Sequence, residues 1–282
     1  MIYVGTCGFS YKDWIGSFYP GKIRPQEMLP YYASCFPAVE IDSSYYGVPP
    51  VSTIERMNRA TPAEFRFCFK VPSTVTHPPD SGVARVHPDA ALFAQSLSLL
   101  KESGKLGCAL LQFPNGFRRT ESTESYLRLA VQALRALPLV AEFRNREWQN
   151  AGTQQLLAEL GVGWCNVDMP HYETLLEPSS DVTSPVGYVR FHGRNAANWW
   201  SGTNVTRYDY EYSPEELEPW TNRVAEIQDA AETTFAFFNN HARGNAARNA
   251  ELFIQLLKTR YGEAADIVAR RDGMPAQGML FE

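Results

Sequence analysis

The sequence predicts an α/β protein built as a single (β/α)8 TIM barrel with parallel strands. Eight short apolar runs of strand length recur along the 282 residues, and helical patterns separate most of them. Repeated strand-then-helix units give parallel strands with right-handed crossovers, and eight such units close into a barrel. The length agrees with this prediction, because one such barrel commonly needs about 250 residues.

The eight strands are predicted at regular intervals, at residues 2–7, 38–42, 65–71, 107–113, 138–144, 162–168, 186–192 and 233–240. Each run ends in two residues set two positions apart, most of them polar or charged. These pairs are Thr6–Gly8, Glu40–Asp42, Cys68–Lys70, Gln112–Pro114, Glu142–Arg144, Asn166–Asp168, Arg190–His192 and Asn239–His241. Side chains alternate along a strand, so each pair shares one face, and residues such as Val39 and Phe143 form an apolar face. If helices cover the apolar face, the eight pairs converge at one end of the barrel.

Capping residues and helical spacing mark the helices between the strands. Ser52 and Glu55 form a capping box ahead of one helix, and the His-Pro step at 87–88 opens another that is expected to run to residue 104. Further helices are expected at 122–136, 153–160, 213–230 and 245–260. Residues 170–185 contain three prolines and no convincing helical period, so we expect the sixth helix to be short or missing.

An open, doubly wound sheet is the alternative to a barrel. Such a sheet usually has fewer units and a glycine-rich first turn. Here the first turn, Cys7-Gly8-Phe9-Ser10, is followed by aromatic residues and lacks the GxGxxG pattern. The sequence therefore favours one barrel domain over residues 1–262, with residues 263–282 as a C-terminal extension.

Composition bounds the class of protein. A net charge of −5 argues against a generally basic nucleic-acid-binding surface, while it leaves room for a local positive cleft. The five cysteines are scattered and show no metal-ligand spacing, so we expect free thiols, with no metal and no cofactor. Met1 leads directly into the first strand, and no apolar stretch approaches about 18 residues. We therefore expect a cytoplasmic protein that does not interact with membranes.

Three long connections follow the C-terminal ends of strands, at about 8–24, 72–87 and 193–212. They carry Tyr11, Trp14, Phe18, Tyr19, His77, Trp199, Trp200 and Tyr208. These rings have two interpretations, since they either stack on a base or sugar of a ligand or pack the loops against the barrel. The sequence leaves both interpretations open.

Several longer stretches resemble the YecE-like TIM-barrel family, which has no firmly established activity. The matching stretches are GTCGFSYKDWIGSFYP, AVEIDSSYYGVPP, FKVPSTVTH, LLQFP, AEFRNREW, YVRFHGR, RYDYEYSPEEL and FFNNHARGNAARNA. They span nearly the whole chain in the expected order, and the resemblance implies a single (β/α)8 barrel. Two positions depart from the family pattern. Asn145 stands where the family more usually has His, which weakens any mechanism that needs an imidazole beside Arg144, and Tyr45-Tyr46 replaces a Phe-Tyr pair.

Charged residues gather at the predicted strand ends. Glu40, Asp42, Glu142 and Asp168 bring four negative charges, and Lys70, Arg144, Arg190 and Arg194 bring four positive ones. Apolar side chains would fill a barrel interior adequately, so this number of charges favours a ligand site over a purely structural ion network. We expect the catalytic residues to be Glu142, Asp168, His192 and Glu40, with His192 as the proton carrier near neutral pH.

The basic residues at these ends favour an anionic, phosphate-bearing ligand. The planar guanidinium fork suits phosphate, and barrels often bind phosphate through the loops after strands seven and eight. The expected ligand-binding residues are Lys70, Arg144, Arg190, Arg194, Asn240, His241 and Gly244.

Three functional hypotheses follow, and whether the protein is an enzyme stays open between them. The first is a hydrolase that acts on a phosphate-bearing small molecule or on nucleic acid. The second is a glycoside- or sugar-acting barrel enzyme that uses Glu142 and Asp168 as paired carboxylates. The third is a non-catalytic binding module for an anionic ligand.

The C-terminal tail suggests a separate partner. Gln277, Leu280 and Phe281 resemble the Gln-x-x-Leu-Phe peptide by which bacterial DNA-processing proteins dock on the DNA sliding clamp. In this interpretation the two apolar side chains insert into a groove of the clamp while the polar stem supplies reach. The alternative is a tail that folds back on its own barrel through Leu280 and Phe281.

Overall fold

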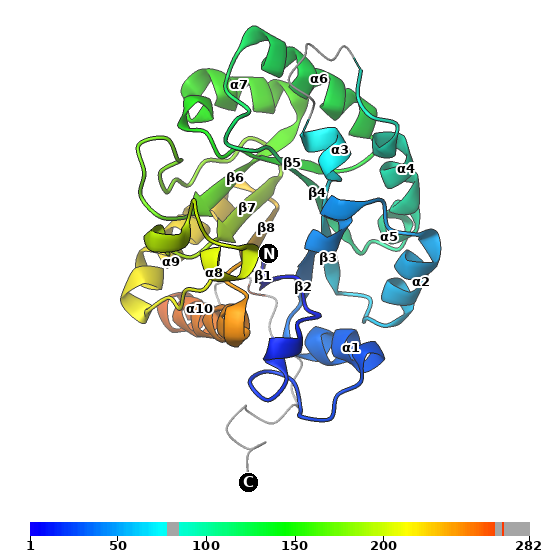
Figure 1. The fold of residues 1–282 in the computed structure, drawn as a ribbon, viewed down its shortest axis with the longest axis vertical. Coiled ribbons are helices and arrows are strands. Elements are labelled where there is room, and N and C mark those ends of the chain that lie inside the picture. Colours follow the sequence, from blue (N-terminus) through cyan, green and yellow to red (C-terminus); the bar gives the residue numbers. More distant parts are fainter. Residues whose placement is uncertain (78–84, 263–266, 268–282) are drawn as a thin grey trace.

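The computed structural model describes residues 1–77, 85–262 and 267. Within these residues, parallel strands form a closed barrel in sequence order, and the last strand pairs with the first (Figure 1). The strands are β1 Ile2–Cys7, β2 Ala38–Ile41, β3 Arg66–Lys70, β4 Leu106–Gln112, β5 Leu139–Glu142, β6 Val162–Asp168, β7 Val186–Phe191 and β8 Thr233–Phe238. The predicted (β/α)8 barrel is confirmed, and each strand boundary lies within two residues of its predicted place.

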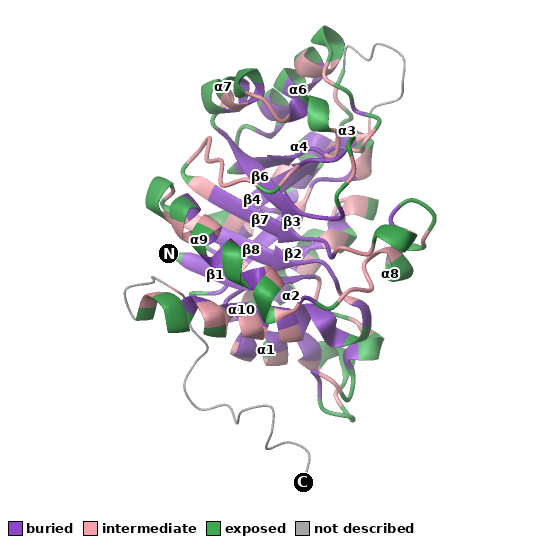
Figure 2. Ribbon diagram, turned by 90° about the vertical axis from the view of Figure 1, so that its left-hand side faces the viewer, coloured by how far each residue is buried: buried purple, intermediate pink, exposed green. Residues whose placement is uncertain are grey.

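Helices surround the barrel, and the longer ones bury one face against it, whereas α8 is largely exposed (Figure 2). The α-helices are α1 Pro25–Cys35, α2 Val51–Arg59, α3 Ser73–Thr76, α4 Asp89–Ser96, α5 Ser98–Glu102, α6 Glu121–Leu134, α7 Ala151–Leu160, α8 Asn204–Arg207, α9 Pro214–Ala230 and α10 Asn245–Tyr261. Short 3-10 helices are η1 Lys12–Trp14, η2 Asp42–Tyr46, η3 Arg146–Trp148, η4 Ala196–Asn198 and η5 Ala242–Gly244. None of the helices in the described part of the chain is long and apolar enough to cross a membrane.

Local capping chemistry explains several helix ends. Ser213 accepts a hydrogen bond from the backbone N–H of Glu216, which begins α9 with the predicted capping box. Gly161 ends α7 in the left-handed region, with φ of 66°, which glycine adopts without a steric penalty. Residues 169–185 contain no helix, so the prediction for the sixth helix is confirmed.

Two predicted helix details are wrong, and three helices, α1 and the one-turn α3 and α8, were not predicted. Helix α2 begins at Val51 after Pro50 without a side-chain cap, so the Ser52–Glu55 capping box does not form. The single helix expected up to residue 104 divides at Leu97 into α4 and α5. Helix α1 was not predicted, and its interior proline is a residue that normally argues against a helix.

Strand register decides which side chains face the barrel interior. On β6, Cys165 lies beside Tyr188 and Val167 lies beside Arg190 of β7. Neighbouring residues in register share a face, so Cys165 and Val167 point inward, and Asn166 and Asp168 point toward the helices. The expectation that all eight terminal pairs converge is therefore wrong for β6. It is also wrong for β1, where the Thr6 hydroxyl donates to Tyr32 of α1, 2.9 Å away.

The C-terminal extension lies largely beyond the described residues. Ile267 forms an isolated bridge with Ile2 at the start of β1. The predicted clamp-docking residues Gln277, Leu280 and Phe281 fall outside the part of the chain that the structure describes.

Candidate functional site

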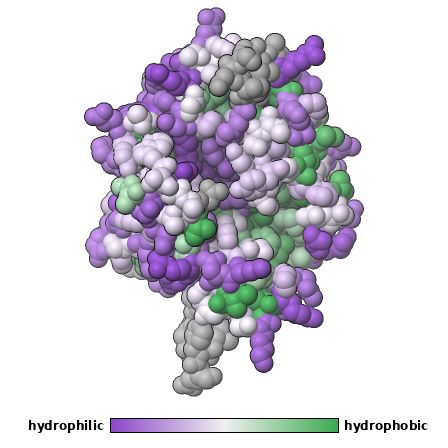
Figure 3. Space-filling view, in the orientation of Figure 1, coloured by the Kyte–Doolittle hydropathy of each residue, from purple (hydrophilic) through white to green (hydrophobic). Residues whose placement is uncertain are grey.

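A cavity of about 620 Å³ opens at the C-terminal ends of the strands. Figure 3 faces this end of the molecule, where hydrophilic residues surround a hollow. The lining residues are Tyr11, Asp42, Ser43, Tyr45, Tyr46, Lys70, His77, Gln112, Pro114, Asn115, Arg144, Leu175, Arg190, Trp199, Trp200, Arg207, Tyr208, Asn239 and His241. A volume of this size is typical of small-molecule sites, which usually enclose about 300–1,000 Å³.

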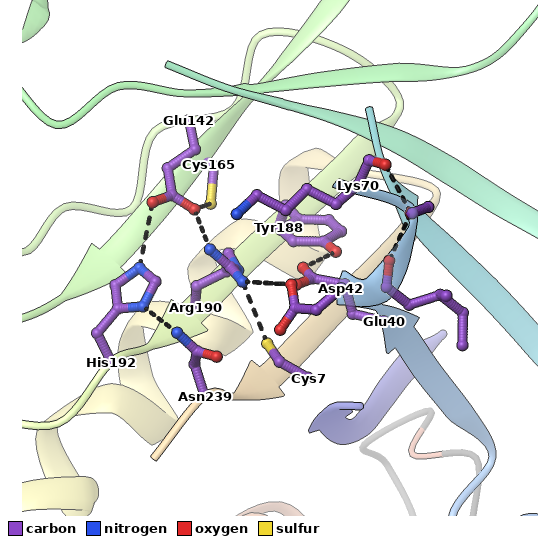
Figure 4. A network of polar contacts seen from close by, with 12 residues as sticks. Cys7, Glu40, Asp42, Lys70, Glu142, Cys165, Tyr188, Arg190, His192 and Asn239 are labelled. Atoms are coloured by element: carbon purple, nitrogen blue, oxygen red, sulfur yellow. Dashed lines mark hydrogen bonds and ion pairs between the residues drawn. The ribbon is translucent and has the colours of Figure 1, made fainter. Parts of the chain in front are cut away.

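Buried charges form a layer under the floor of this cavity (Figure 4). The Arg190 guanidinium donates from Nη2 to Oε1 of Glu40 at 2.6 Å and from Nη1 to Oε2 of Glu142 at 2.7 Å. Nη2 also lies 3.4 Å from Oδ1 of Asp42. Arg144 contacts the second oxygen of Glu142 through Nε. One arginine therefore joins carboxylates from two strands on different sides of the barrel.

Glu40 is the carboxyl group in this layer whose protonation changes near neutral pH. Burial raises its pKa to about 7, against the opposing effect of Arg190, and the charge of Asp42 adds to the increase. The Tyr188 hydroxyl donates to Oε2 of Glu40 at 2.6 Å. Glu40 and Asp42 lie close together, with side-chain oxygens within 4.8 Å of one another. Because its pKa is about 7, the Glu40 carboxyl is close to half protonated at neutral pH.

Glu142 has the opposite electrostatic environment. Burial alone would raise its pKa, but Arg144, Arg190 and His192 together lower the pKa well below its usual range. Glu142 is fully buried and is not among the cavity-lining residues. Its carboxylate therefore anchors the two arginines beneath the cavity floor.

His192 does not titrate near neutral pH as the sequence suggested. Burial and the charge of Arg144 lower its pKa to about 3, so the imidazole is neutral at physiological pH. Its Nδ1 lies 3.0 Å from Nδ2 of Asn239, and its Nε2 lies 3.2 Å from Oε1 of Glu142. Because the Asn239 amide group donates to Nδ1, the ring proton belongs on Nε2, toward the Glu142 carboxylate.

Asp168 and Arg194 lie between the barrel and its helices and do not line the cavity. Asp168 accepts hydrogen bonds from Tyr212 at 2.6 Å and from Nε1 of Trp220 in α9 at 2.7 Å. Arg194 donates to both oxygens of the same carboxylate, at 2.9 and 2.7 Å. Asp168 was assigned to the site because the wrong face of β6 was expected to point inward. Arg194, from the loop after β7, is held away from the cavity by its pairing with this outward-facing carboxylate.

Of the predicted site residues after β8, one lines the cavity and two lie outside it. His241 lines the cavity and stacks on Tyr11, with ring centroids 4.7 Å apart. Asn240 points outward and donates to the Tyr210 carbonyl and to Asn249. Gly244 begins α10 with φ of 78° and lies outside the cavity, where an added Cβ would stand 2.7 Å from Oγ of Ser17.

Two cations on the cavity wall have no carboxylate partner among the described residues. The Lys70 ammonium lies 4.3 Å from the centre of the Tyr45 ring, and the structure records no ion pair for it. Arg207 lines the same cavity from helix α8, and its Nε is buried without a hydrogen-bond partner in the described structure. Arg207 was not among the predicted site residues, because it lies within the long connection after β7 and not at the end of a strand.

The loop aromatics fall into two groups, one packed against the barrel and one lining the cavity. Trp14, Phe18 and Tyr19 are buried and pack against one another beneath the first loop. Tyr11, His77, Trp199, Trp200 and Tyr208 line the cavity. Gln112 also lines it, as its place at a strand end predicted, and so do Tyr45 and Tyr46, which were not among the predicted site residues.

The donor set of Cys7, Glu40 and Asp42 has the spacing of a metal site, since its ligand atoms lie within 4.8 Å of one another. However, Nη2 of Arg190 already lies 3.4 Å from the Cys7 sulfur, 2.6 Å from Glu40 and 3.4 Å from Asp42. The guanidinium occupies the position that a metal ion would take, and its charge would repel one. These residues therefore do not suit a metal ion.

Comparison with known proteins identifies relatives over nearly the whole chain. A family model described as "Protein of unknown function DUF72" matches residues 3–274. UPF0759 protein YunF of Bacillus subtilis is 32% identical over 281 residues, which cover 94% of this chain and 98% of that protein. UPF0759 protein YecE of Escherichia coli K12 is 34% identical over 77 residues, which cover 27% of this chain and 26% of that protein.

Solved structures of similar proteins share the fold. A crystal structure of a DUF72 family protein from Thermotoga maritima has a TM-score of 0.83 at 34% identity, covering 92% of this chain and 99% of that one. A DUF72 family protein from Enterococcus faecalis has a TM-score of 0.79 at 30% identity, with coverage of 92% and 96%.

Proposed function

The chain belongs to the DUF72 family, whose function is unknown, and we propose that it is a hydrolase that binds a phosphate ester in the cavity at the barrel mouth. One observation carries this proposal. Among the described residues that line the cavity, Lys70, Arg144, Arg190 and Arg207 are cationic, and Asp42 is the one carboxylate. This concentration of positive charge occurs in a protein whose net charge is −5.

The buried carboxylates do not cancel this charge. With Glu40 and Glu142 included, the balance beneath and around the cavity is four cations to three carboxylates. It becomes four to two when Glu40, whose pKa is about 7, is protonated. Lys70 and Arg207 have no carboxylate partner in the described structure, so both are free to meet phosphate oxygens.

Asp42 and Glu40 supply the acid–base chemistry in this proposal. Asp42 faces the cavity from the start of η2, so its carboxylate is placed to accept a proton from a water molecule that attacks phosphorus. As the water oxygen bonds to phosphorus, the bond from phosphorus to the ester oxygen breaks, and the ester oxygen leaves as the alcohol or phenol after taking up a proton. Glu40 lies behind Asp42 and exchanges a proton near neutral pH, which makes it a reservoir for the proton that Asp42 takes up. The cations stabilise the negative charge on the phosphoryl oxygens in the transition state.

The positions of Glu142 and Asp168 do not support the alternative of a sugar-acting enzyme. That hypothesis required Glu142 and Asp168 to flank a common reacting centre. Asp168 instead bonds to Trp220 of α9 behind the strand, and Glu142 is covered by the two arginines that it anchors. The non-catalytic binding module uses the same cations, and only turnover distinguishes it from a hydrolase.

The experiment combines binding and turnover on the full chain. Pyrophosphate binding is measured by calorimetry at several salt concentrations, and release of nitrophenol is followed from p-nitrophenyl phosphate and from bis(p-nitrophenyl) phosphate. We expect binding that weakens with salt, as for any contact with phosphate through exposed cations, and turnover that Asp42→Asn abolishes while binding remains.

The matched variants are Lys70→Met and Arg207→Met against Arg59→Met, an exposed arginine on α2 outside the cavity. The first two should each weaken pyrophosphate binding about tenfold, corresponding to the loss of one charged contact, and the third should leave it unchanged. Absence of pyrophosphate binding at millimolar concentration would overturn the proposal. Binding without hydrolysis of any phosphate ester would favour the binding module.

A further inference from the structure

We propose that the ligand of this cavity is a single nucleotide, whose base stacks on the exposed rings of Tyr46 and Trp200 while its phosphate meets the cations deeper in the cavity. This inference rests on the proposed phosphate site and adds the class of substrate to it. It is carried by the order of rings and cations along two sides of the cavity.

Tyr46 and Trp200 are exposed aromatic side chains on the same cavity, with 77% and 52% of their surface accessible. Each is held by one ring contact. Tyr46 meets Tyr45 at 5.2 Å and 87°, and Trp200 meets Tyr172 at 5.7 Å and 61°. Because an edge-to-face contact covers at most one face of a ring, each side chain keeps a face on which a base can stack.

The residue beside each exposed ring is an aromatic side chain that contacts a cation. Tyr45 precedes Tyr46 and carries the Lys70 ammonium over its ring at 4.3 Å. Trp199 precedes Trp200, is buried, and has the Arg144 guanidinium 5.7 Å from its ring centre. On both sides of the cavity the outer ring is therefore more exposed than the cation, since Lys70 is half-buried and the Arg144 side chain is 11% exposed.

This order matches the two ends of a nucleotide. A base presents flat π-faces and tolerates solvent at its edges, whereas a phosphate requires cations and hydrogen-bond donors. A sugar phosphate or inorganic phosphate would use the cations but leave both outer rings without a contact. The two sides of the cavity also come from loops after different strands, η2 after β2 and the 193–212 connection after β7, so the rings and cations converge only in the folded barrel.

The charge outside the cavity limits the length of the ligand. A neighbouring hollow shares Asn115 with the cavity and contains Arg118 and Arg146. Arg118 is paired with Glu147, and Arg146 lies 3.1 Å from Glu177. Within the described residues, this hollow therefore offers no uncompensated cation to the next phosphate of a polynucleotide, and a single nucleotide satisfies the site.

The test compares ligands that differ in whether they contain a base, a sugar or more than one nucleotide. Affinities of the four ribonucleoside 5′-monophosphates, ribose 5-phosphate, pyrophosphate and a 12-nucleotide oligodeoxyadenylate are measured by calorimetry at about 150 mM salt, with tryptophan fluorescence as a second signal. We expect the tightest nucleotide to bind at least about tenfold more tightly than ribose 5-phosphate, because stacking of one base is worth about that factor or more. The oligonucleotide should bind no more tightly than the nucleotide.

Variants separate the rings from the cations. Tyr46→Leu and Trp200→Leu should each lower nucleotide affinity toward that of ribose 5-phosphate without changing ribose 5-phosphate binding, whereas Lys70→Met should weaken both ligands. Leu92→Ala, at an exposed apolar position on α4, is the control and should change neither.

Three results would overturn the inference, and they differ in what they leave standing. Equal affinity for nucleotides and ribose 5-phosphate would show that the base contributes nothing to binding, while the proposed phosphate site would stand. Tighter binding of the oligonucleotide than of any single nucleotide would replace the single nucleotide by a strand. If nucleotides, ribose 5-phosphate and pyrophosphate all fail to bind, both this inference and the proposed function are wrong.

Discussion

The Arg190 guanidinium lies 2.6 Å from the Glu40 carboxylate; both side chains are buried, with Arg190 lining the cavity and Glu40 behind it. Arg190 is also the group that holds Glu142 from the other side. The positive charge that faces the proposed phosphate is therefore the same charge that neutralises two carboxylates inside the barrel. Stability, proton binding and anion binding are consequently coupled at this residue.

Removing Arg190 should destabilise the fold. Arg190→Met leaves Glu40 and Glu142 without their shared partner, and breaking a buried ion pair from one side costs roughly 3–5 kcal/mol. We expect a loss of that size in the free energy of unfolding, measured by urea denaturation. Arg59→Met, at an exposed position on α2, should stay within about 0.5 kcal/mol of the parent protein. Equal stabilities for the two variants would contradict the structural role of Arg190.

Anion binding should be accompanied by proton uptake. A phosphate beside Arg190 competes with Glu40 for the guanidinium, which favours the protonated form of a carboxyl group whose pKa is already about 7. We expect calorimetry of pyrophosphate binding at pH 7 in buffers of different ionisation enthalpy to show uptake of a fraction of one proton. Glu40→Gln should abolish the uptake, and a proton count unchanged in that variant would assign it to another group.

Glu40 and His192 should give opposite pH dependences to the free energy of unfolding. The pKa of Glu40 is raised from 4.5 to about 7 in the folded state, so between these values stability falls as the pH rises. The pKa of His192 is lowered from 6.5 to about 3, so between these values stability falls as the pH falls. Each slope is about 1.4 kcal/mol per pH unit, and the two should cancel from about pH 4.5 to 6.5.

Single variants should reveal the two slopes. Relative to the parent protein, Glu40→Gln should lose stability as the pH is lowered from 6.5 to 4.5, because only the His192 contribution remains. His192→Asn should gain stability over the same change, because only the Glu40 contribution remains. Urea denaturation at half-unit intervals of pH measures both, and curves parallel to that of the parent protein would show that neither pKa is shifted in the fold.

Replacement by asparagine should mainly reduce stability at Asp168 and mainly reduce turnover at Asp42. Asp168→Asn weakens the contacts with Arg194, Tyr212 and Trp220, and should cost at least about 2 kcal/mol of stability because bonds to a buried charge are lost. Asp42→Asn changes a partly exposed group on the cavity and should cost less than about 1 kcal/mol while abolishing turnover. Thermal unfolding and phosphate-ester hydrolysis, measured on both variants, check this pair of outcomes.

Gly5→Ala should disrupt the pairing of β1 with β2. A Cβ at Gly5 would lie 2.1 Å from the Ala38 carbonyl oxygen, which belongs to the neighbouring strand and cannot move without breaking the ladder. We expect a loss of about 3 kcal/mol or more, at the upper end for overpacking. Gly116→Ala has open space around its Cβ and should change stability by less than about 1 kcal/mol in the same denaturation assay.

Local patterns in the sequence were sufficient for the barrel and for most of its strand ends. Apolar runs and capping residues such as Ser213 and Gly161 depend on neighbours within a few positions, and these signals survive in the fold. Within the barrel, the pairs that begin with Glu40, Glu142 and Arg190 all point inward at the predicted end. These pairs could be recognised in the sequence by their charge, because a charged residue beside an apolar run is unusual in a buried strand.

The choice of face was decided by tertiary structure. Every residue of β6 is buried, so its sequence contains no polar alternation that separates inside from outside, and only pairing of Cys165 with Tyr188 sends Asp168 toward the helices. Arg207 joins the cavity through a long connection whose path no local pattern specifies. The pKa of Glu40 likewise depends on Asp42 and on Arg190, which is 150 residues distant in the chain, because desolvation and charge arise only once the barrel closes.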